Sequence, residues 1–236
     1  MPKVTAFHRP DTVEAALALL AEPGRVPIGG GTVINTPGGE PVEVVDLSRL
    51  DLQYIGEKKK HLRLGATAVL QDVVEHPAAP PLVAEMAKRE LPSTLRTLAT
   101  VGGTIATGDA ESLFVAALLA FGCTVELAPE GIVPLSDYLA GSHQGLITGA
   151  TIETDGTTGF SETGRTPADT PIVAALARRH AAGTTLVLTG VADVPVLVSA
   201  EDPLAGLDPA DDFRGTSEYR RHLAEVHSRR ALDQLG

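Results

Sequence analysis

The segment from Leu95 to Phe121, LRTLATVGGTIATGDAESLFVAALLAF, constrains the fold of this chain most strongly. A glycine pair, Gly102–Gly103, lies in a run of small and hydroxyl residues, and an apolar run from Leu113 to Phe121 follows. Glycine lets a ligand approach the main chain closely. A helix that starts after such a loop adds N–H groups and a positive dipole end, which attract phosphate.

Helix-capping residues stand on both sides of the apolar run. We expect Asp109 or Ser112 to cap the helix at its start and Gly122 to end it. The segment also fits a tight turn in an ordinary α/β domain, in which the glycines serve only the path of the chain. A second glycine cluster, at 29–31, favours the ligand-binding interpretation.

Neither glycine cluster matches a familiar phosphate-binding motif. The dinucleotide fingerprint G-x-G-x-x-G, aligned with its first glycine at Gly29, fails because Ile34 stands at the position of the motif's third glycine. The P-loop pattern fails because Asp109-Ala110 follows Gly103 and Gly108 in place of the lysine and the hydroxyl residue. The chain therefore carries two glycine–threonine segments about 70 residues apart, with no catalytic base evidently paired to either.

Charge, hydropathy and cysteine content limit the partners. The formal net charge is -11, which argues against a nucleic-acid or anionic-membrane surface because phosphate binding needs clustered Lys and Arg. No apolar run approaches the ~20 residues that span a bilayer, and residues 1–20 are too polar for a signal peptide. The single cysteine, Cys123, forbids an internal disulfide and an iron–sulfur cluster held by this chain alone. We predict a cytoplasmic chain without membrane insertion, with Cys123 buried in a strand.

Hydrophobic periodicity and turn residues predict alternating strands and helices up to about residue 150. A strand at Met1–Phe7 leads to a helix that begins at Asp11 or Thr12 and stops at Gly24, and Pro37-Gly38-Gly39 breaks the chain again. The other expected elements are a strand at 42–47, a turn and strand at 56–66, helices at 69–75 and 81–89, the glycine loop, a strand, turn and short helix at 123–140, and a strand at 147–154.

The C-terminal third has a different composition. Asp155–Pro171 is rich in Gly, Thr and Pro, and we place a domain boundary just before it, near residue 150. Residues 171–183 fit either a helix by propensity or a buried strand closed by a turn, and residues 184–199 are strongly strand-like. A last helix begins at Thr216 or Ser217, and its apolar positions with a period of 3.6 are Tyr219, Leu223 and Val226.

The titratable residues form no recognisable catalytic or metal-binding pattern. The seven histidines lack metal-site spacing such as H-x-x-x-H with a carboxylate. We interpret His76, His143, His222 and His227 as surface or structural residues. No nucleophile-elbow pattern supports Ser-His-Asp chemistry. We therefore predict neither a metal site nor a catalytic residue.

Six segments form an ordered series along the chain: FHRPDTVEAALALLAE at 7–22, GGGT at 29–32, VVDLSRL at 44–50, LRLGATAVLQDV at 62–73, LRTLATVGGTIA at 95–106 and EYRRHLAEVHSRRAL at 218–232. The series spans nearly the whole chain, which makes it far more specific than a single short match. It resembles the flavin-binding medium subunit of the molybdenum hydroxylases, the family of aerobic carbon monoxide dehydrogenase and xanthine dehydrogenase.

The resemblance implies an α+β fold in two domains. A PCMH-type FAD-binding domain would span residues 1–150, with subdomains at about 1–55 and 56–150. A C-terminal domain over residues 151–236, like that of carbon monoxide dehydrogenase flavoproteins, would hold a three-stranded antiparallel sheet packed by the last helix. This expectation requires Pro171–Ala181 to be a strand.

The resemblance also implies an oxidoreductase subunit that transfers electrons. In the family, a molybdenum subunit oxidises the substrate, two [2Fe–2S] clusters on a small subunit carry the electrons, and FAD passes them to the final acceptor. The implied partners are therefore an iron–sulfur small subunit and a molybdopterin large subunit.

Two glycine loops grip the FAD diphosphate in this family, and their positions can be transferred to this chain. We expect backbone N–H groups of Gly30–Thr32 and Gly102–Thr104 to make most of the diphosphate contact. The implied cofactor-binding residues are Ile28, Gly29, Gly30, Gly31, Thr32, Val33, Thr100, Gly102, Gly103, Thr104, Thr107 and Asp109.

Three positions depart from the family's pattern. Val33 replaces an acidic residue, Thr104 an asparagine and Leu113 an aspartate, and each loss removes a polar partner at ~1 kcal/mol or more per hydrogen bond. The departures motivate a second hypothesis, a flavin-free relative that keeps the fold as an assembly or scaffold protein. A third hypothesis, a stand-alone flavin oxidase, lacks an acid, a base or a substrate-binding group beside the glycine segments.

Overall fold

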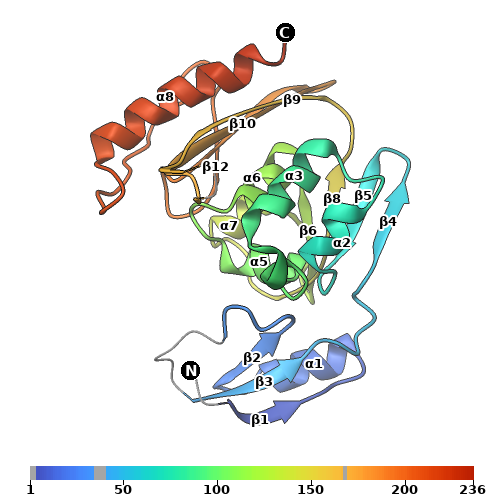
Figure 1. Cartoon of the computed structure of the whole chain (residues 1–236). Coiled ribbons are helices and arrows are strands. Elements are labelled where there is room, and N and C mark those ends of the chain that lie inside the picture. The colour runs from blue at the N-terminus through green and yellow to red at the C-terminus, as the bar shows by residue number, and fades with distance from the viewer. Residues whose placement is uncertain (1–3, 35–40, 167–168) are drawn as a thin grey trace.

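The computed structural model describes residues 4–34, 41–166 and 169–236, which form three units stacked along the molecule (Figure 1). A small N-terminal sheet lies at one end, a helix-rich unit in the middle, and a sheet covered by a long helix at the other end. This arrangement confirms the predicted α+β fold. Residues 1–3 of the predicted first strand and the predicted break at Pro37-Gly38-Gly39 lie outside the described residues.

The N-terminal unit is a three-stranded parallel sheet with one helix. Its strands are β1 (Val4–His8), β2 (Arg25–Ile28) and β3 (Val42–Asp46), in the order β1-β3-β2. The helix α1 (Val13–Leu20) is capped by Thr12, whose hydroxyl accepts a hydrogen bond from the Ala15 N–H at 3.1 Å. Gly29–Val33, which we call the first glycine segment, leaves the sheet directly after β2.

The central unit contains a five-stranded antiparallel sheet in the order β4-β5-β8-β6-β7. Six helices complete it and place its glycine-rich segment beside the N-terminal unit (Figure 1). The strands are β4 (Ile55–Lys58), β5 (His61–Gly65), β6 (Thr124–Ala128), β7 (Gly131–Pro134) and β8 (Leu146–Glu153), and the helices are α2 (Leu70–Glu75), α3 (Pro81–Glu90), α4 (Ser93–Arg96), α5 (Val101–Thr107), α6 (Leu113–Ala120) and α7 (Leu135–Leu139).

Helix α6 is the centre of the main core, because all eight of its residues are buried. Ser112 is its cap and accepts a hydrogen bond from the Val115 N–H at 3.1 Å. Gly122, with φ of +63°, ends it in the left-handed region that favours glycine. Of the two expected caps, Asp109 instead closes a local turn by accepting a bond from the Glu111 N–H at 2.8 Å. Cys123 is buried one residue before β6, close to its predicted place in a strand.

The glycine pair Gly102–Gly103 lies inside a helix, and the expectation of a loop is wrong. Thr100 caps α5 by accepting a hydrogen bond from the Gly103 N–H at 3.1 Å, so both glycines occupy the first turn. Gly102 is a glycine because a Cβ there would lie 2.9 Å from the Cβ of Ala66. We call Thr100–Thr104 the second glycine segment.

The C-terminal unit is an antiparallel sheet covered on its outer face by α8 (Ser217–Asp233) (Figure 1). Its strands are β9 (Thr157–Thr163), β10 (Val173–His180), β11 (Gly183–Thr189) and β12 (Val196–Val198), in the order β12-β11-β10-β9. The three long strands are the predicted three-stranded sheet, and the short β12 adds a fourth.

Strand β10 resolves the ambiguity of residues 171–183. Its residues 173–178 are all buried because the sheet lies between α8 and α6. Ala174 and Leu176 belong to the main core, whereas Val173, Ala175 and Ala177 face the α8 side. A strand buried on both faces reads as a continuous apolar run and loses the period of two.

Strand β9 lies within Asp155–Pro171, the segment rich in Gly, Thr and Pro, for which the sequence analysis predicts no strand. A Cβ at Gly159 would lie 2.0 Å from the Ala231 carbonyl oxygen, so a strand glycine here lets α8 pack closely. The Gly, Thr and Pro content of this segment gives no strand signal. The proposed domain limits stay predictions, and β8 crosses residue 150.

Helix α8 begins after the Thr216 cap as predicted, but of its three expected apolar positions only Leu223 is buried. Tyr219 is 42% exposed. The residues buried on α8 are Arg220, Leu223, Ala224, His227, Ser228 and Ala231. Arg220 and His227 can be buried on this face because both are hydrogen bonded. A search for periodic apolar residues cannot detect such buried polar residues.

Candidate functional site

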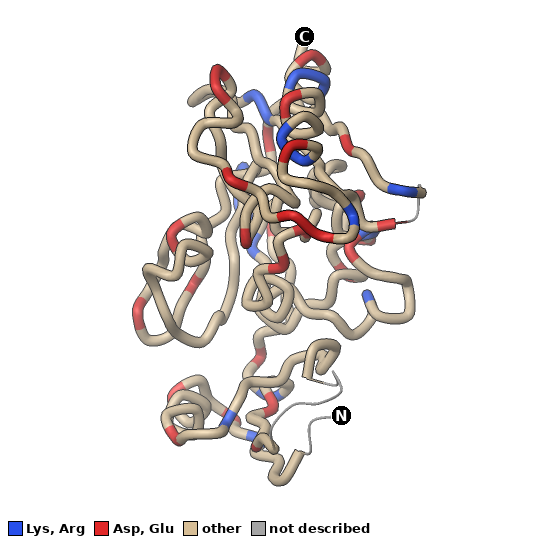
Figure 2. The backbone as a smooth tube through the Cα atoms, turned by 90° about the vertical axis from the view of Figure 1, so that its left-hand side faces the viewer, with Lys and Arg blue, Asp and Glu red and all other residues tan. Residues whose placement is uncertain are grey.

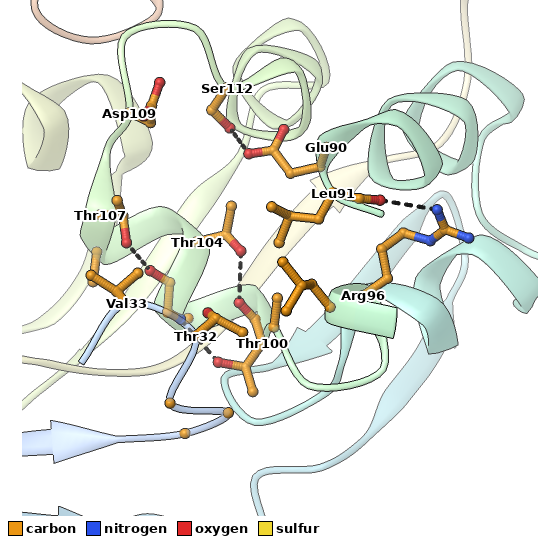
Figure 3. Close-up of a pocket in the computed structure, with 18 of the residues that line it drawn as sticks. Thr32, Val33, Glu90, Leu91, Arg96, Thr100, Thr104, Thr107, Asp109 and Ser112 are labelled. Atoms are coloured by element: carbon orange, nitrogen blue, oxygen red, sulfur yellow. Dashed lines mark hydrogen bonds between the residues drawn. The ribbon is translucent and has the colours of Figure 1, made fainter. Parts of the chain in front are cut away.

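A cavity of about 1260 Å³ opens where the three units meet. The N-terminal unit contributes the first glycine segment, and the C-terminal unit contributes Asp169–Pro171. The central unit contributes Ala66 and some of the residues within 88–113 and 138–147. Figure 3 shows hydroxyl, carboxyl and apolar side chains pointing into this space. All twelve residues expected at the cofactor line it: Ile28, Gly29, Gly30, Gly31, Thr32, Val33, Thr100, Gly102, Gly103, Thr104, Thr107 and Asp109.

The first glycine segment packs directly against the second. A Cβ built on Gly30 would lie 1.6 Å from the Leu98 carbonyl oxygen, and one on Gly29 would lie 2.8 Å from the Thr100 hydroxyl. Gly31 has φ of +71°, which favours glycine. Within the described part of the chain, neither the Gly30 nor the Thr32 N–H donates to another residue. These N–H groups are available to a ligand.

The N–H groups of the second glycine segment are already bonded within the protein. The Gly102 N–H donates to the Ala66 carbonyl at 2.9 Å, and the Gly103 N–H to the Thr100 hydroxyl at 3.1 Å. The Thr104 N–H donates to the Thr100 carbonyl at 2.9 Å. Each of these three N–H groups therefore has an acceptor within the protein, and the expectation that they contact a diphosphate stays a prediction.

The threonine hydroxyls of α5 also donate inward. The hydroxyl of Thr104 donates to the Thr100 carbonyl and that of Thr107 to the Gly103 carbonyl, each at 2.9 Å (Figure 3). A threonine hydroxyl has one hydrogen and two lone pairs. These two side chains can therefore only accept hydrogen bonds from a ligand in the cavity.

Glu90 is a cavity residue that the sequence did not reveal. It lies at the end of α3, where its carboxyl oxygens accept from the Ser112 hydroxyl at 2.7 Å and the Phe114 N–H at 2.9 Å. Burial raises the pKa of the Glu90 carboxyl, and nearby Asp109 adds to this rise. The two bonds close the start of α6 to an outside anion. No motif surrounds Glu90 in sequence, so no pattern could have indicated it.

Arg96 fixes the opposite wall of the cavity (Figure 3). Its guanidinium donates to the Lys88 carbonyl at 2.7 Å, the Leu91 carbonyl at 3.0 Å and the Gln71 side chain at 3.1 Å. It thereby ties α4 to the end of α3 and to α2. Lys88 and Arg89 also line the cavity, and Arg89 forms an ion pair with Glu162 of β9.

A network from the C-terminal unit holds the loop between α5 and α6. Arg214 pairs with Glu111 and donates to the Thr170 carbonyl, and both of these acceptor residues line the cavity. Arg220 pairs with Asp212 at 2.6 Å, and this hydrogen bond is the main reason that the pKa of Asp212 falls to about 2. The third unit therefore positions one wall of the site.

His227 and Cys123 are buried away from the cavity. His227 is buried between the hydroxyls of Ser161 and Thr163, each at 2.8 Å, and burial lowers the pKa of its ring. Burial raises the pKa of the Cys123 thiol to about 12, which leaves it unreactive. Among the described residues, no group of three or more His, Cys, Asp and Glu could hold a metal ion.

Acidic and basic residues are spread over the described part of the chain (Figure 2). Figure 2 shows acidic positions in all three units and alternating charges along α8. This distribution agrees with the argument from net charge against a phosphate-backbone partner. Of the helices in the described residues, none has the length and apolar character required to span a bilayer.

Comparisons with known proteins place this geometry in context. Residues 3–153 match the family described as the FAD binding domain in molybdopterin dehydrogenase. The chain is 27% identical over 241 residues to YgfM of Escherichia coli K12, an uncharacterized protein, and the match covers 94% of this chain and 93% of YgfM.

Two further matches carry the name carbon monoxide dehydrogenase. The medium chain of that enzyme from Afipia carboxidovorans is 27% identical over 274 residues, covering 97% of this chain and 95% of the relative. A chain of the enzyme from Hydrogenophaga pseudoflava, solved without the Mo-pyranopterin moiety, superposes with a TM-score of 0.88 over 100% of this chain and 98% of that one. At 23% identity the latter match shows the fold.

Proposed function

This chain belongs to the family of FAD-binding domains in molybdopterin dehydrogenases, and we propose that it binds FAD in the cavity between its two glycine segments. The observation that carries the proposal is the direct packing of segments about 70 residues apart, Gly29 on Thr100 and Gly30 on Leu98. Glycines are required there for the two backbones to meet, and the meeting point lines the cavity.

The residues present fit a flavin dinucleotide, an elongated molecule with a ring, a polyol and a diphosphate. The Gly30 and Thr32 N–H groups would hold phosphate oxygens. Gly103 is exposed in the cavity, and its missing side chain leaves room for the ligand beside α5. Apolar side chains such as Leu91 and Leu95 would contact the ring. FAD supplies one- and two-electron redox chemistry when bound, and this chain holds and orients it.

We further propose that the chain is the electron-transfer subunit of a molybdenum-dependent dehydrogenase. Its partners would be an iron–sulfur small subunit with [2Fe–2S] clusters and a molybdopterin large subunit. One cysteine in the whole sequence, buried at Cys123, supports the placement of the clusters on another chain. The location in the cytoplasm stays a prediction from sequence.

A flavin-free scaffold is the second candidate function, and the three departures from the family's pattern favour it. Val33 is 56% exposed at the cavity and offers no polar group to a ligand. The hydroxyl of Thr104 is turned back into its helix, and Leu113 is buried in α6. The loss of three polar partners weakens FAD binding in proportion to the bonds lost.

Purification from the native host separates the two functions. The electron-transfer proposal predicts co-purification with both partner subunits and a bound flavin that bleaches when the iron–sulfur subunit is reduced. A scaffold would co-purify with the partners but show no flavin absorption and take up no added FAD. A chain that always elutes alone would contradict both functions.

A further inference from the structure

One aromatic side chain of this chain lies almost fully in solvent. Phe213, in the segment before α8, is 89% exposed, and Tyr219 at the start of α8 is 42% exposed. The sequence contains only five phenylalanines, three tyrosines and no tryptophan, so aromatic residues are scarce. Exposed aromatic side chains are candidate anchors for a partner protein, because aromatic residues carry much of the energy of protein interfaces. We call residues 208–219 the anchor segment.

Phe213 is held on a fixed turn and not on a loose loop. The carboxylate of Asp212 accepts hydrogen bonds from the Arg214 N–H at 2.8 Å and the Gly215 N–H at 3.0 Å. The Asp212 N–H donates in turn to the Gly215 carbonyl at 3.1 Å, and the Arg220 guanidinium pairs with the carboxylate at 2.6 Å. A side chain on such a preorganised turn loses little conformational freedom when a partner covers it.

Arg214 connects the anchor segment to the cavity. Its guanidinium pairs with Glu111 and donates to the Thr170 carbonyl, and both of these residues line the cavity. Phe213 is the neighbouring residue in the chain, but it is not one of the residues that line the cavity. A partner that covers Phe213 would therefore lie beside the C-terminal wall of the cavity without filling it.

The charge of the anchor segment is one-sided. Its carboxylate residues Asp208, Asp211 and Glu218 are exposed, and Figure 2 shows acidic positions along this part of the chain. Arg214 and Arg220 point inward, and their side chains are only 12% and 5% exposed. A complementary partner surface has an apolar pocket bordered by Lys or Arg. A second copy of this chain, with a formal net charge of -11, does not supply that complement.

We propose that the anchor segment docks the iron–sulfur small subunit, with Phe213 inserted into an apolar pocket that Lys or Arg residues border on that subunit. This inference rests on the proposed function, in which a cluster on another chain must come within electron-transfer reach of a flavin in the cavity. Through Arg214, the docked subunit would also hold Glu111 and Thr170 in the wall of the cavity.

The test measures binding of the full chain to the immobilised iron–sulfur subunit, with its clusters in place. Phe213→Ser removes the aromatic ring, and Phe213→Leu keeps an apolar side chain. Ile132→Ser is the matched control, because Ile132 is 71% exposed and lies on β7 of the central unit. Asp208→Lys reverses one exposed charge of the anchor segment, and Glu57→Lys reverses one on β4.

We expect Phe213→Ser to weaken binding of the iron–sulfur subunit about thirtyfold or more, the loss of an interface hot spot. Phe213→Leu should recover most of this loss. Asp208→Lys should weaken binding about threefold, and added salt should reduce the difference because it screens exposed charges. Ile132→Ser and Glu57→Lys should bind as the parent does. FAD titration and thermal unfolding should give parent values throughout, because all four positions are exposed and none lines the cavity.

Three results would overturn the inference. Parent-like binding of the iron–sulfur subunit by Phe213→Ser removes the anchor and leaves the electron-transfer proposal intact. If Phe213→Ser instead loses only the molybdopterin subunit, or only a dimer of this chain, the anchor segment serves another partner. A parent chain that binds FAD but no iron–sulfur subunit contradicts the electron-transfer proposal, and the anchor with it.

Discussion

The two glycine segments line one cavity but use glycine for different purposes. In the first segment, Gly29 and Gly30 bring two backbones into contact, since a Cβ on Gly30 would lie 1.6 Å from the Leu98 carbonyl oxygen. In the second segment, a Cβ on Gly103 would meet only the Thr100 hydroxyl, at 2.9 Å. The absence of a side chain at Gly103 leaves space in the cavity beside α5.

The first glycine segment serves the packing of the fold, whereas the second leaves room for a ligand. The first segment is fixed by what it packs against, and its N–H groups are left for a ligand. The second is fixed by its own helix and by Ala66, and its N–H groups donate to the Ala66 carbonyl and to the hydroxyl and carbonyl of Thr100. A substitution in the first segment should therefore damage fold and binding together, and one at Gly103 should damage binding alone.

The largest effect is expected for Gly30→Val. The side chain must displace the Leu98 carbonyl, so we expect a loss of about 3 kcal/mol or more in the free energy of unfolding, at the upper end of overpacking effects. FAD binding should be lost as well. Denaturant unfolding measures the first and titration the second. Gly56→Ala is the control, because a Cβ there meets nothing within 4 Å; equal stability of both variants would contradict the packing account.

Gly103→Val should abolish FAD binding while the fold persists. Its side chain enters the cavity and needs only the Thr100 hydroxyl to shift, so the stability should change by about 1 kcal/mol or less. FAD titration and thermal unfolding on one preparation give both numbers. If this variant binds FAD as the parent does, the second glycine segment is only a structural turn of helix.

Thr104→Asn should leave FAD binding unchanged or tighten it by up to about tenfold, the worth of one restored hydrogen bond. The amide would supply a donor to the ligand, whereas the Thr104 hydroxyl donates to the Thr100 carbonyl. Titration of this variant beside the parent measures the change. Weaker binding by the asparagine variant would show that the accepting oxygen of Thr104 matters more than a new donor.

The smallest expected effect is a pH dependence of the free energy of unfolding. It comes from His227, which does not line the cavity. The pKa of His227 is lowered below its ordinary value of 6.5 by burial, so the unfolded chain takes up a proton first as pH falls. Its contribution to stability is complete above about pH 6.5 and is lost progressively below it. Chemical unfolding from pH 7.5 to 5.5 should show this slope, and His227→Gln should flatten it without changing FAD affinity at pH 7.5. A slope that persists in the variant assigns the effect to another group.

Much of the fold could be predicted because its signals are local. The caps Thr12 and Thr216, the apolar run of α6 and the stop at Gly122 follow from residue type and spacing. Strand β9 could not be found, since its Gly159 serves the close approach of Ala231, about 70 residues away. Such a contact leaves no mark on the neighbouring sequence.

In the site, too, some features could be predicted from the sequence and others depend on contacts between distant residues. The glycine segments could be placed at one cavity because the resemblance to the family implies that both contact one cofactor, and both line the cavity. The loss of the second segment's N–H donors depends on Ala66, which the fold brings to Gly102. Glu90 likewise becomes a cavity residue only through its bonds to Ser112 and Phe114.

The most direct measurement is a calorimetric titration of the purified chain with FAD, run beside Gly103→Val. The account predicts saturable binding of one FAD per chain with the visible absorption of a bound flavin, and no binding by the folded variant. A folded parent chain that takes up no FAD, or a variant that binds it equally well, would contradict the assignment of this cavity to the flavin.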